Sequence, residues 1–246
     1  MRVRDLAEQL DVSEMTVRRD IDELARQQLI EKVHGGATSI GDLSSFEPGF
    51  AAKQRRQRDE KDAIAERALE LVRPQTAIGL TAGTTTWTFA RRLRSIPGLR
   101  VVTNAPSVAQ VLYGGAADDM TVVLTGGVRT PSDALVGPLA TEALSKLHVD
   151  ILFMGVHGID PKQGYSTPNL AEAEVNAAFI EAADRVVVVA DHTKWAMRGL
   201  ARIAPLDRAD LVISDDGLAA EARAAFADLR VQLSIVTPAF AREHSA

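Results

Sequence analysis

The chain has 246 residues, of which 46% are hydrophobic and 25% charged, and its formal net charge at pH 7 is −5. This composition is that of an ordinary globular protein and excludes a mostly disordered chain. The sequence contains no cysteine, which excludes disulfides, thiol catalysis and cysteine-ligated metal, and we expect a cytoplasmic protein. No apolar run approaches the roughly 20 residues that cross a bilayer, and the charged start predicts no signal peptide. Because the net charge is negative, any contact with DNA must come from a local arrangement.

Residues 1–37 predict two short helices followed by a turn. Apolar side chains recur at the i, i+3, i+4, i+7 spacing of one helical face, and these are Val3, Leu6, Ala7 and Leu10. Ser13 is a suitable N-cap for a second helix that runs to about residue 29 and buries Val17, Ile21 and Leu24. Residues 30–36 are strand-like and end in a glycine pair, which predicts a tight turn or the tip of a wing.

The second helix has the side chains of a DNA-recognition helix. At 100° per residue, the side chains that point away from its buried face are Met15, Arg18, Arg19 and Asp22, with Thr16 on the flank. In a helix-turn-helix unit the early residues of the second helix meet base edges, and arginine binds guanine or phosphate. An amphipathic helix pair alone is more often a plain packing unit. Residues 1–37 also hold six basic and eight acidic residues, which gives them no positive charge.

A dense sequence motif favours a DNA-recognition helix over a plain packing unit. It runs LAEQLDVSEMTVRRDI from Leu6 and ends in VHGGA from Val33. This stretch resembles the DNA-binding domain of the DeoR family of bacterial transcriptional regulators. The resemblance implies that residues 13–29 form the recognition helix and that residues 32–36 belong to the wing. The residues it assigns to DNA contact are Ser13, Met15, Thr16, Arg18, Arg19, Lys32, His34 and Gly35.

Two further expectations concern the edges of this unit. Members of the family usually begin with one more helix, so we expect either a start upstream of Met1 or a compromised DNA-binding unit. Residues 38–60 are expected to be a linker, because they are turn-rich and contain Pro48-Gly49. A basic run occupies residues 53–58; such a run is usually a solvated helix face, and the sharper alternative is a contact with the DNA backbone.

Residues 61–246 predict an α/β domain with a largely parallel sheet. A helix ends before Pro74, and beyond it short apolar runs alternate with helical stretches. The predicted strands cover residues 76–80, 99–103, 120–124, 151–155, 186–190, 211–214 and 231–236.

Small and polar residues follow several of these strands, which favours one shared pocket for an anionic ligand. In open α/β sheets, ligands bind beyond the carboxyl ends of the strands and near helix N-termini. The segments in question are Thr81 to Thr86, Thr103-Asn104, Thr125-Gly126-Gly127 and Asp191 to Lys194, with Asp150 opening a further strand. Each feature alone is usually a plain connection. Neither the dinucleotide fingerprint nor the Walker A loop is present, which disfavours a nucleotide.

This half is also similar to the C-terminal sensor domain of the DeoR family. The matching pieces are Gly83-Thr84-Thr85, Val102-Thr103-Asn104, Gly126-Gly127, Asp150 to Gly155, Glu172 to Val175 and Ala190 to Lys194. The resemblance implies a fold similar to ribose-phosphate isomerases and glucosamine-phosphate deaminases, used to sense phosphorylated sugars. The effector contacts it implies are Gly83, Thr84, Thr85, Asn104, Gly126, Gly127, Asp150, Glu172 and Lys194.

The sequence leaves two functions open. The favoured one is a DNA-binding repressor of sugar-metabolism genes, with operator DNA and a phosphorylated sugar as partners. A homo-oligomer is expected, because such proteins read paired half-sites. The alternative is an isomerase or deaminase that uses Asp150, Glu172 and Lys194 as acid–base groups. A recognition helix has no use in such an enzyme, so we predict a non-enzymatic protein with no cofactor. We also predict no metal site, because the five histidines include no pair at helical spacing.

Overall fold

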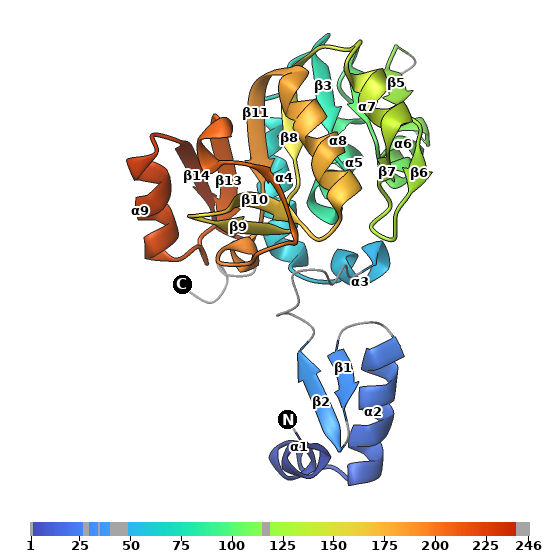
Figure 1. Ribbon diagram of the computed structural model, residues 1–246, viewed down its shortest axis with the longest axis vertical. Helices are drawn as coiled ribbons and strands as arrows, with labels where there is room; N and C mark the ends of the chain where they lie inside the picture. Colours follow the sequence, from blue (N-terminus) through green and yellow to red (C-terminus); the bar gives the residue numbers. More distant parts are fainter. Residues whose placement is uncertain (1, 27–29, 34, 40–48, 115–118, 240–246) are drawn as a thin grey trace.

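The structure is a computed structural model that describes residues 2–26, 30–33, 35–39, 49–114 and 119–239 (Figure 1). A small N-terminal unit and a larger α/β unit are separate bodies in this view. Within the described residues, no helix is long and apolar enough to span a bilayer.

The N-terminal unit is a helix-turn-helix with a hairpin wing. Its helices are α1 (Val3–Leu10) and α2 (Glu14–Arg26), and its hairpin pairs β1 (Ile30–Val33) with β2 (Gly36–Ser39). Gly35 forms the turn at φ +82°, a conformation that glycine adopts without steric cost. The small core consists of Val3, Ala7, Val17, Ile21 and Ala37. The predicted helices and wing turn are thus confirmed, but Leu10 and Leu24 are exposed by 62% and 37%, and the predicted end of the second helix at residue 29 lies outside the described residues.

The larger unit is built on one parallel sheet of seven strands in the order β14-β13-β11-β8-β3-β4-β5. The strands are β3 (Ala77–Leu80), β4 (Arg100–Thr103), β5 (Thr121–Leu124), β8 (Val149–Met154), β11 (Ala183–Val189), β13 (Leu211–Asp215) and β14 (Gln232–Val236). Each coincides, within a few residues, with one of the seven predicted apolar runs. The predicted α/β architecture is confirmed.

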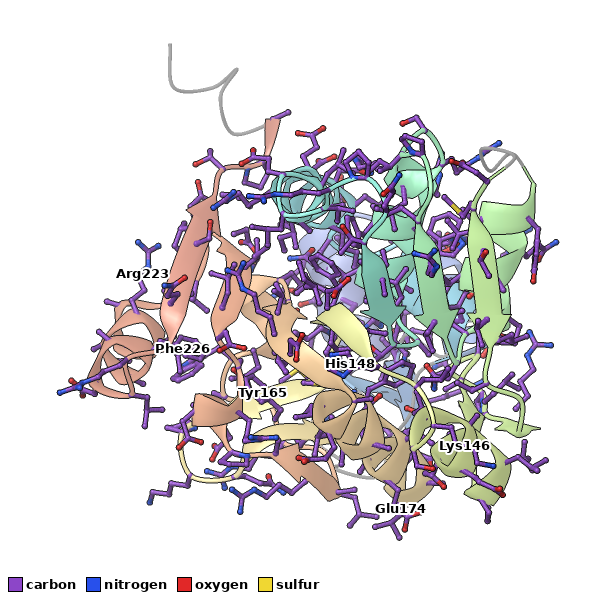
Figure 2. All side chains as sticks on the ribbon, turned by 90° about the horizontal axis from the view of Figure 1, so that it is seen from above. Lys146, His148, Tyr165, Glu174, Arg223 and Phe226 are labelled. Carbon is purple, nitrogen blue, oxygen red and sulfur yellow. The ribbon has the colours of Figure 1, made fainter. Side chains whose placement is uncertain are left out.

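Helices cover both faces of the sheet. One face packs against α4 (Arg58–Leu69), α5 (Thr84–Leu93) and α6 (Pro106–Tyr113). The other packs against α7 (Pro138–Leu144), α8 (Leu170–Glu181) and α9 (Ala220–Asp228). Figure 2 looks down on this sandwich, with Phe226 between α9 and the sheet. Successive side chains of a strand point to opposite faces, so Leu152 joins one core and Phe153 the other.

Several elements of the larger unit escape the sequence pattern. A three-stranded antiparallel sheet joins β9 (Gly158–Asp160), β10 (Gly164–Thr167) and β12 (Ala201–Ala204), and β6 (Val128–Arg129) pairs with β7 (Leu135–Val136). These strands have two to four residues, too few for a hydrophobic period. Tyr165 anchors the small sheet, since its ring is fully buried and its hydroxyl donates to the Leu206 carbonyl at 3.2 Å (Figure 2).

The range expected to be a linker, residues 38–60, contains regular structure at both ends. β2 extends to Ser39, the short helix α3 spans Phe50–Gln54, and α4 begins at Arg58. The α3 helix lies against the larger unit: the Phe50 N–H donates to the Pro131 carbonyl at 3.4 Å, and the Phe50 and Trp87 rings meet edge to face at 6.1 Å.

Candidate functional site

A pocket opens where the strand order of the sheet reverses. The chain passes from β3 outward through β4 and β5, then returns to β8 on the other side of β3 and continues outward through β11. Loops after β3 and β8 therefore diverge and leave a crevice, the usual ligand position in open α/β sheets. The residues around it are Lys53, Ala82, Gly83, Thr84, Thr85, Ser132, Gly155, Val156, His157, Thr167, Glu172, Asn176, Val189, Ala190 and Lys194. We call this hollow of about 70 Å³ the switch-point pocket.

The N-terminus of α5 forms one wall of the switch-point pocket. The first intrahelical bond runs from the Trp87 N–H to the Gly83 carbonyl, so the N–H groups of Thr84, Thr85 and Thr86 have no acceptor within the helix. These groups and the helix dipole favour a negative charge at this wall. Gly83 adopts φ +154°, and a Cβ there would lie 3.2 Å from Oγ1 of Thr86.

Glu172 lies on the opposite wall, in the first turn of α8. Asn169 caps this helix by accepting from the N–H groups of Ala171 and Glu172. The Glu172 carboxylate accepts hydroxyl hydrogen bonds from Thr130 at 2.6 Å, from Thr167 at 3.2 Å and from Ser132. Three hydroxyl donors hold this carboxylate in place, which makes it a fixed acceptor rather than a mobile acid.

Two lysines bring positive charge to the switch-point pocket. Lys194 ends the short helix η1 (His192–Lys194), which Asp191 caps, and its ammonium makes no ion pair with any residue that the structure describes. Lys53 reaches the pocket from α3. Behind them Lys61 donates to the Lys53 carbonyl at 2.7 Å. Burial lowers the pKa of Lys61 to about 8, with the charge of Lys194 acting in the same direction.

Three of the predicted effector residues do not line the switch-point pocket. Asn104, almost fully buried, accepts from the Ala82 N–H at 2.9 Å and donates to the Leu135 carbonyl at 3.1 Å, so it ties the loop after β3 in place. Gly126 and Gly127 lie between β5 and β6. A Cβ on Gly127 would sit 2.4 Å from the Val136 carbonyl, so this glycine is required by close packing against β7.

Asp150 is placed away from the other predicted contacts. It lies at the start of β8, and its carboxylate accepts from the Ala77 N–H at the start of β3, at 2.7 Å. In a parallel sheet the strand starts share one edge and the strand ends the other, so Asp150 lies at the edge opposite the switch-point pocket. Its grouping with Glu172 and Lys194 was wrong, and the acid–base set of the enzymatic alternative is not assembled.

Several pocket residues carry no signal in the sequence. Ser132, Thr167 and Asn176 come from elements whose contact with the pocket depends on the tertiary fold. His157, in the loop between β8 and β9, also lines the pocket. Trp195 packs on the Phe226 ring at 5.8 Å and is not among the lining residues. The pocket residues that do carry a signal follow strand ends: Gly83, Thr84 and Thr85 follow β3, and Lys194 follows β11.

The α2 helix presents a polar surface at its start. The Ser13 hydroxyl accepts from the Thr16 N–H at 3.1 Å and so caps the helix, as predicted. The side chains of Met15, Thr16, Arg18 and Arg19 are exposed, Met15 by 78%. Arg18 lies 3.5 Å from Glu14, and in the wing Lys32 pairs with Asp22 at 2.5 Å. Gly35 accepts from the Val3 N–H at 2.9 Å, which ties the wing to α1, and His34 lies outside the described residues.

Comparison with known proteins identifies the family. A family model described as the DeoR C terminal sensor domain matches residues 56–216, and one described as the DeoR-like helix-turn-helix domain matches residues 1–42. The HTH-type transcriptional regulator GlpR of Haloferax volcanii is 36% identical over 222 residues, which cover 90% of this chain and 86% of that protein. The chain belongs to the DeoR family.

Other relatives place the DeoR-family chain among regulators. The putative aga operon transcriptional repressor of Escherichia coli O157:H7 is 34% identical over 223 residues, covering 90% of this chain and 82% of that protein. The glycerol-3-phosphate regulon repressor of Escherichia coli K12 is 28% identical over 232 residues, covering 94% and 90%. These relatives are named as transcriptional regulators, and the present chain is a DNA-binding transcriptional regulator rather than an enzyme. A D-ribose-5-phosphate isomerase in complex with phospho-erythronic acid shows a limited structural likeness, with a TM-score of 0.41 at 17% identity over 55% of this chain and 53% of that one.

Proposed function

We propose that this regulator represses an operon of sugar metabolism and that a phosphorylated sugar in the switch-point pocket controls its affinity for operator DNA. Relatives are named for such operons: the aga operon repressor, the L-fucose operon activator of Haemophilus influenzae and the glycerol-3-phosphate regulon repressor. Arg18 and Arg19 are the proposed base and phosphate contacts, with Ser13, Met15, Thr16, Lys32, His34 and Gly35 around them. Two copies of the chain would read paired half-sites.

The observation that carries the effector proposal is the meeting of the α5 N-terminus and Lys194 at one hollow. The phosphate would lie on the N–H groups of the Gly83-Thr84-Thr85 turn, since helix N-termini bind anions without further charge. Lys194 would supply a charge-assisted hydrogen bond, and the oriented Glu172 carboxylate would accept from a sugar hydroxyl. Asn104 positions the turn rather than touching the ligand.

The size of the switch-point pocket limits what it encloses. The hollow measures about 70 Å³, well below the roughly 300–1,000 Å³ of a typical small-molecule pocket. The hollow therefore takes the head of a ligand, with the remainder directed toward the solvent. Lys53 of α3 also lines the pocket, and α3 is the first helix described after the DNA-binding unit. A ligand in the pocket would therefore contact the helix that follows the linker.

A thermal-shift screen against phosphorylated sugars tests the effector proposal. A ligand at 100 times its dissociation constant stabilises the protein by about 2.7 kcal/mol. Gly83→Val should remove the shift, because the added methyl groups occupy the place of the phosphate at a backbone angle that valine rarely adopts. Thr85→Ser should retain it, since backbone N–H groups do the binding. Equal shifts in the wild type and Gly83→Val would contradict the proposed phosphate position.

A further inference from the structure

The basic run after the linker forms a second, larger hollow outside the switch-point pocket. A cleft of about 480 Å³ lies where α3, α4 and α5 meet, and its lining includes the basic residues Arg55, Arg58, Lys61 and Arg91. We call it the basic cleft. Arg55, Arg58 and Arg91 are exposed, so their guanidinium groups are presented at the surface.

The charge of the basic cleft is not balanced from within. Among the residues that the structure describes, no carboxylate lies within ion-pair distance of Arg55, Arg58 or Arg91. Asp62 is the one acidic residue of the lining, and it is already paired with Arg92 at 2.8 Å. The exposed Lys146, by contrast, is paired with Glu142 on its own helix at 2.8 Å. Three unpaired arginines in one cleft therefore point to an anionic partner.

The frame that carries these arginines is fixed. The Arg91 guanidinium lies over the Trp87 ring, 5.2 Å from its centroid. Phe50 of α3 packs edge to face against the same ring. The buried Lys61 ammonium donates to the carbonyls of Lys53 and Arg56, which closes the turn between α3 and α4. A preorganised frame lowers the entropy cost of binding.

The DNA-binding unit needs charge that it does not itself supply. Residues 1–37 hold six basic and eight acidic residues, and Arg4, Arg18 and Lys32 each lie beside a carboxylate of the same unit. Affinity for the DNA backbone comes from neutralised phosphates and released counterions. Basic groups close to the unit in the chain are the natural source of that affinity.

The covalent connection keeps the basic cleft close to the DNA. Ten peptide steps join Ser39, the last residue of β2, to Gly49, which precedes α3, and they span at most about 35 Å. One turn of duplex DNA is about 34 Å. The linker therefore limits the separation between the end of β2 and α3, the helix that borders the basic cleft.

We propose that the basic cleft binds the phosphate backbone of DNA beside the half-site, with Arg55, Arg58 and Arg91 as the phosphate contacts. The sensor domain thereby supplies the sequence-independent part of the DNA affinity. This inference rests on the proposed DNA-binding function and assigns a second contact surface to it.

The test is the salt dependence of binding of the full chain to a fluorescent 30-base-pair duplex of random sequence. Each phosphate contact contributes about −0.9 to the slope of log K against log salt, so the triple variant R55A/R58A/R91A should make the slope less negative by about 2.7. The charge-preserving R55K/R58K/R91K should keep the wild-type slope. The matched control R73A/R100A/R202A removes the same charge from exposed arginines that do not line the basic cleft, and should also keep it.

The outcomes separate this inference from the function on which it rests. An unchanged slope in the alanine triple variant, with normal binding by the wild type, overturns the proposed DNA contact of the basic cleft and leaves the DNA-binding function intact. An equal fall in the control variant overturns it as well, because net charge would then explain the effect. No duplex binding by the wild type overturns both the cleft and the proposed DNA-binding function. A lost thermal shift with sugar phosphates, at an unchanged slope, would assign the cleft to a small anion and overturn the DNA contact.

Discussion

The two units of this DeoR-family regulator are held together in different ways. The sensor domain has two extensive cores on either side of a seven-stranded sheet. Among the residues that the structure describes, the DNA-binding unit has a core of five buried hydrophobic residues, and it exposes Leu10 by 62% and Met15 by 78%. Small units bury a smaller fraction of their apolar surface and are correspondingly marginal. Packing therefore dominates the stability of the sensor domain, whereas helix caps and single hydrogen bonds matter in the DNA-binding unit.

The largest expected effect is on the core of the sensor domain. Phe179 on α8 is fully buried, and Phe179→Ala should lower the free energy of unfolding by about 3–5 kcal/mol through lost contacts and a cavity. Glu174 lies on the same helix and is exposed (Figure 2), so Glu174→Ala should stay within about 0.5 kcal/mol. Denaturant unfolding measures both. A loss below 1 kcal/mol for Phe179→Ala would contradict a closely packed interface between α8 and the sheet.

The next effect is on effector affinity. Lys194→Ala should weaken binding of the sugar phosphate that gives the largest thermal shift by about ten- to a hundredfold, because a charge-assisted contact is worth roughly 1.5–3 kcal/mol. Lys162→Ala, an exposed lysine that is not part of the switch-point pocket, is the control and should bind normally. Calorimetric titration checks both variants. Equal affinities would remove Lys194 from the site.

A comparable loss is expected at the DNA surface, where two adjacent arginines have different proposed roles. Arg18→Ala should cost about 1–3 kcal/mol and relax sequence preference, whereas Arg19→Ala should weaken binding to all sequences alike. The comparison uses duplexes selected from a random pool by the wild-type protein, at one fixed salt concentration. Unchanged binding in the double alanine variant would show that α2 is not the recognition helix.

The smallest effect is on the cap of α2. Ser13→Ala removes the acceptor of the Thr16 N–H and should destabilise the DNA-binding unit by about 1 kcal/mol. Ser13→Asp retains an acceptor and should restore the helix. Amide hydrogen exchange within residues 14–26 detects the loss without disturbing the sensor domain. Equal protection in wild type and Ser13→Ala would mean that packing, rather than the cap, fixes the start of α2.

The hydrophobic pattern was sufficient to predict the framework of both units. Buried parallel strands are continuous apolar runs, so residues 186–190 stand out in the sequence, and residues 186–189 form the buried part of β11. The short strand β9 has no such signal, because Gly158–Asp160 is stabilised by pairing with β10 and by the close approach of Met197 to Gly158. Local pattern predicts an element only where the element buries a full face.

The candidate site was predictable in part, for a topological reason. Gly83 and Lys194 follow strand ends, and the ends of parallel strands share one edge, so both line the switch-point pocket. The same rule places Asp150, which opens β8, at the other edge. Lys53 and Thr167 reach the pocket only through tertiary packing, and spacing along the chain carries no information about that.

The proposed regulation depends on coupling between the two units, and one titration tests this coupling directly. The sugar phosphate identified by thermal shift is titrated calorimetrically into the full chain, alone and in the presence of saturating selected duplex. An effector acts on DNA binding only if its affinity differs between the two states. We expect the two dissociation constants to differ by about 5- to 150-fold, a coupling of about 1–3 kcal/mol. Equal constants would show that the switch-point pocket, even when occupied, does not control the DNA-binding unit.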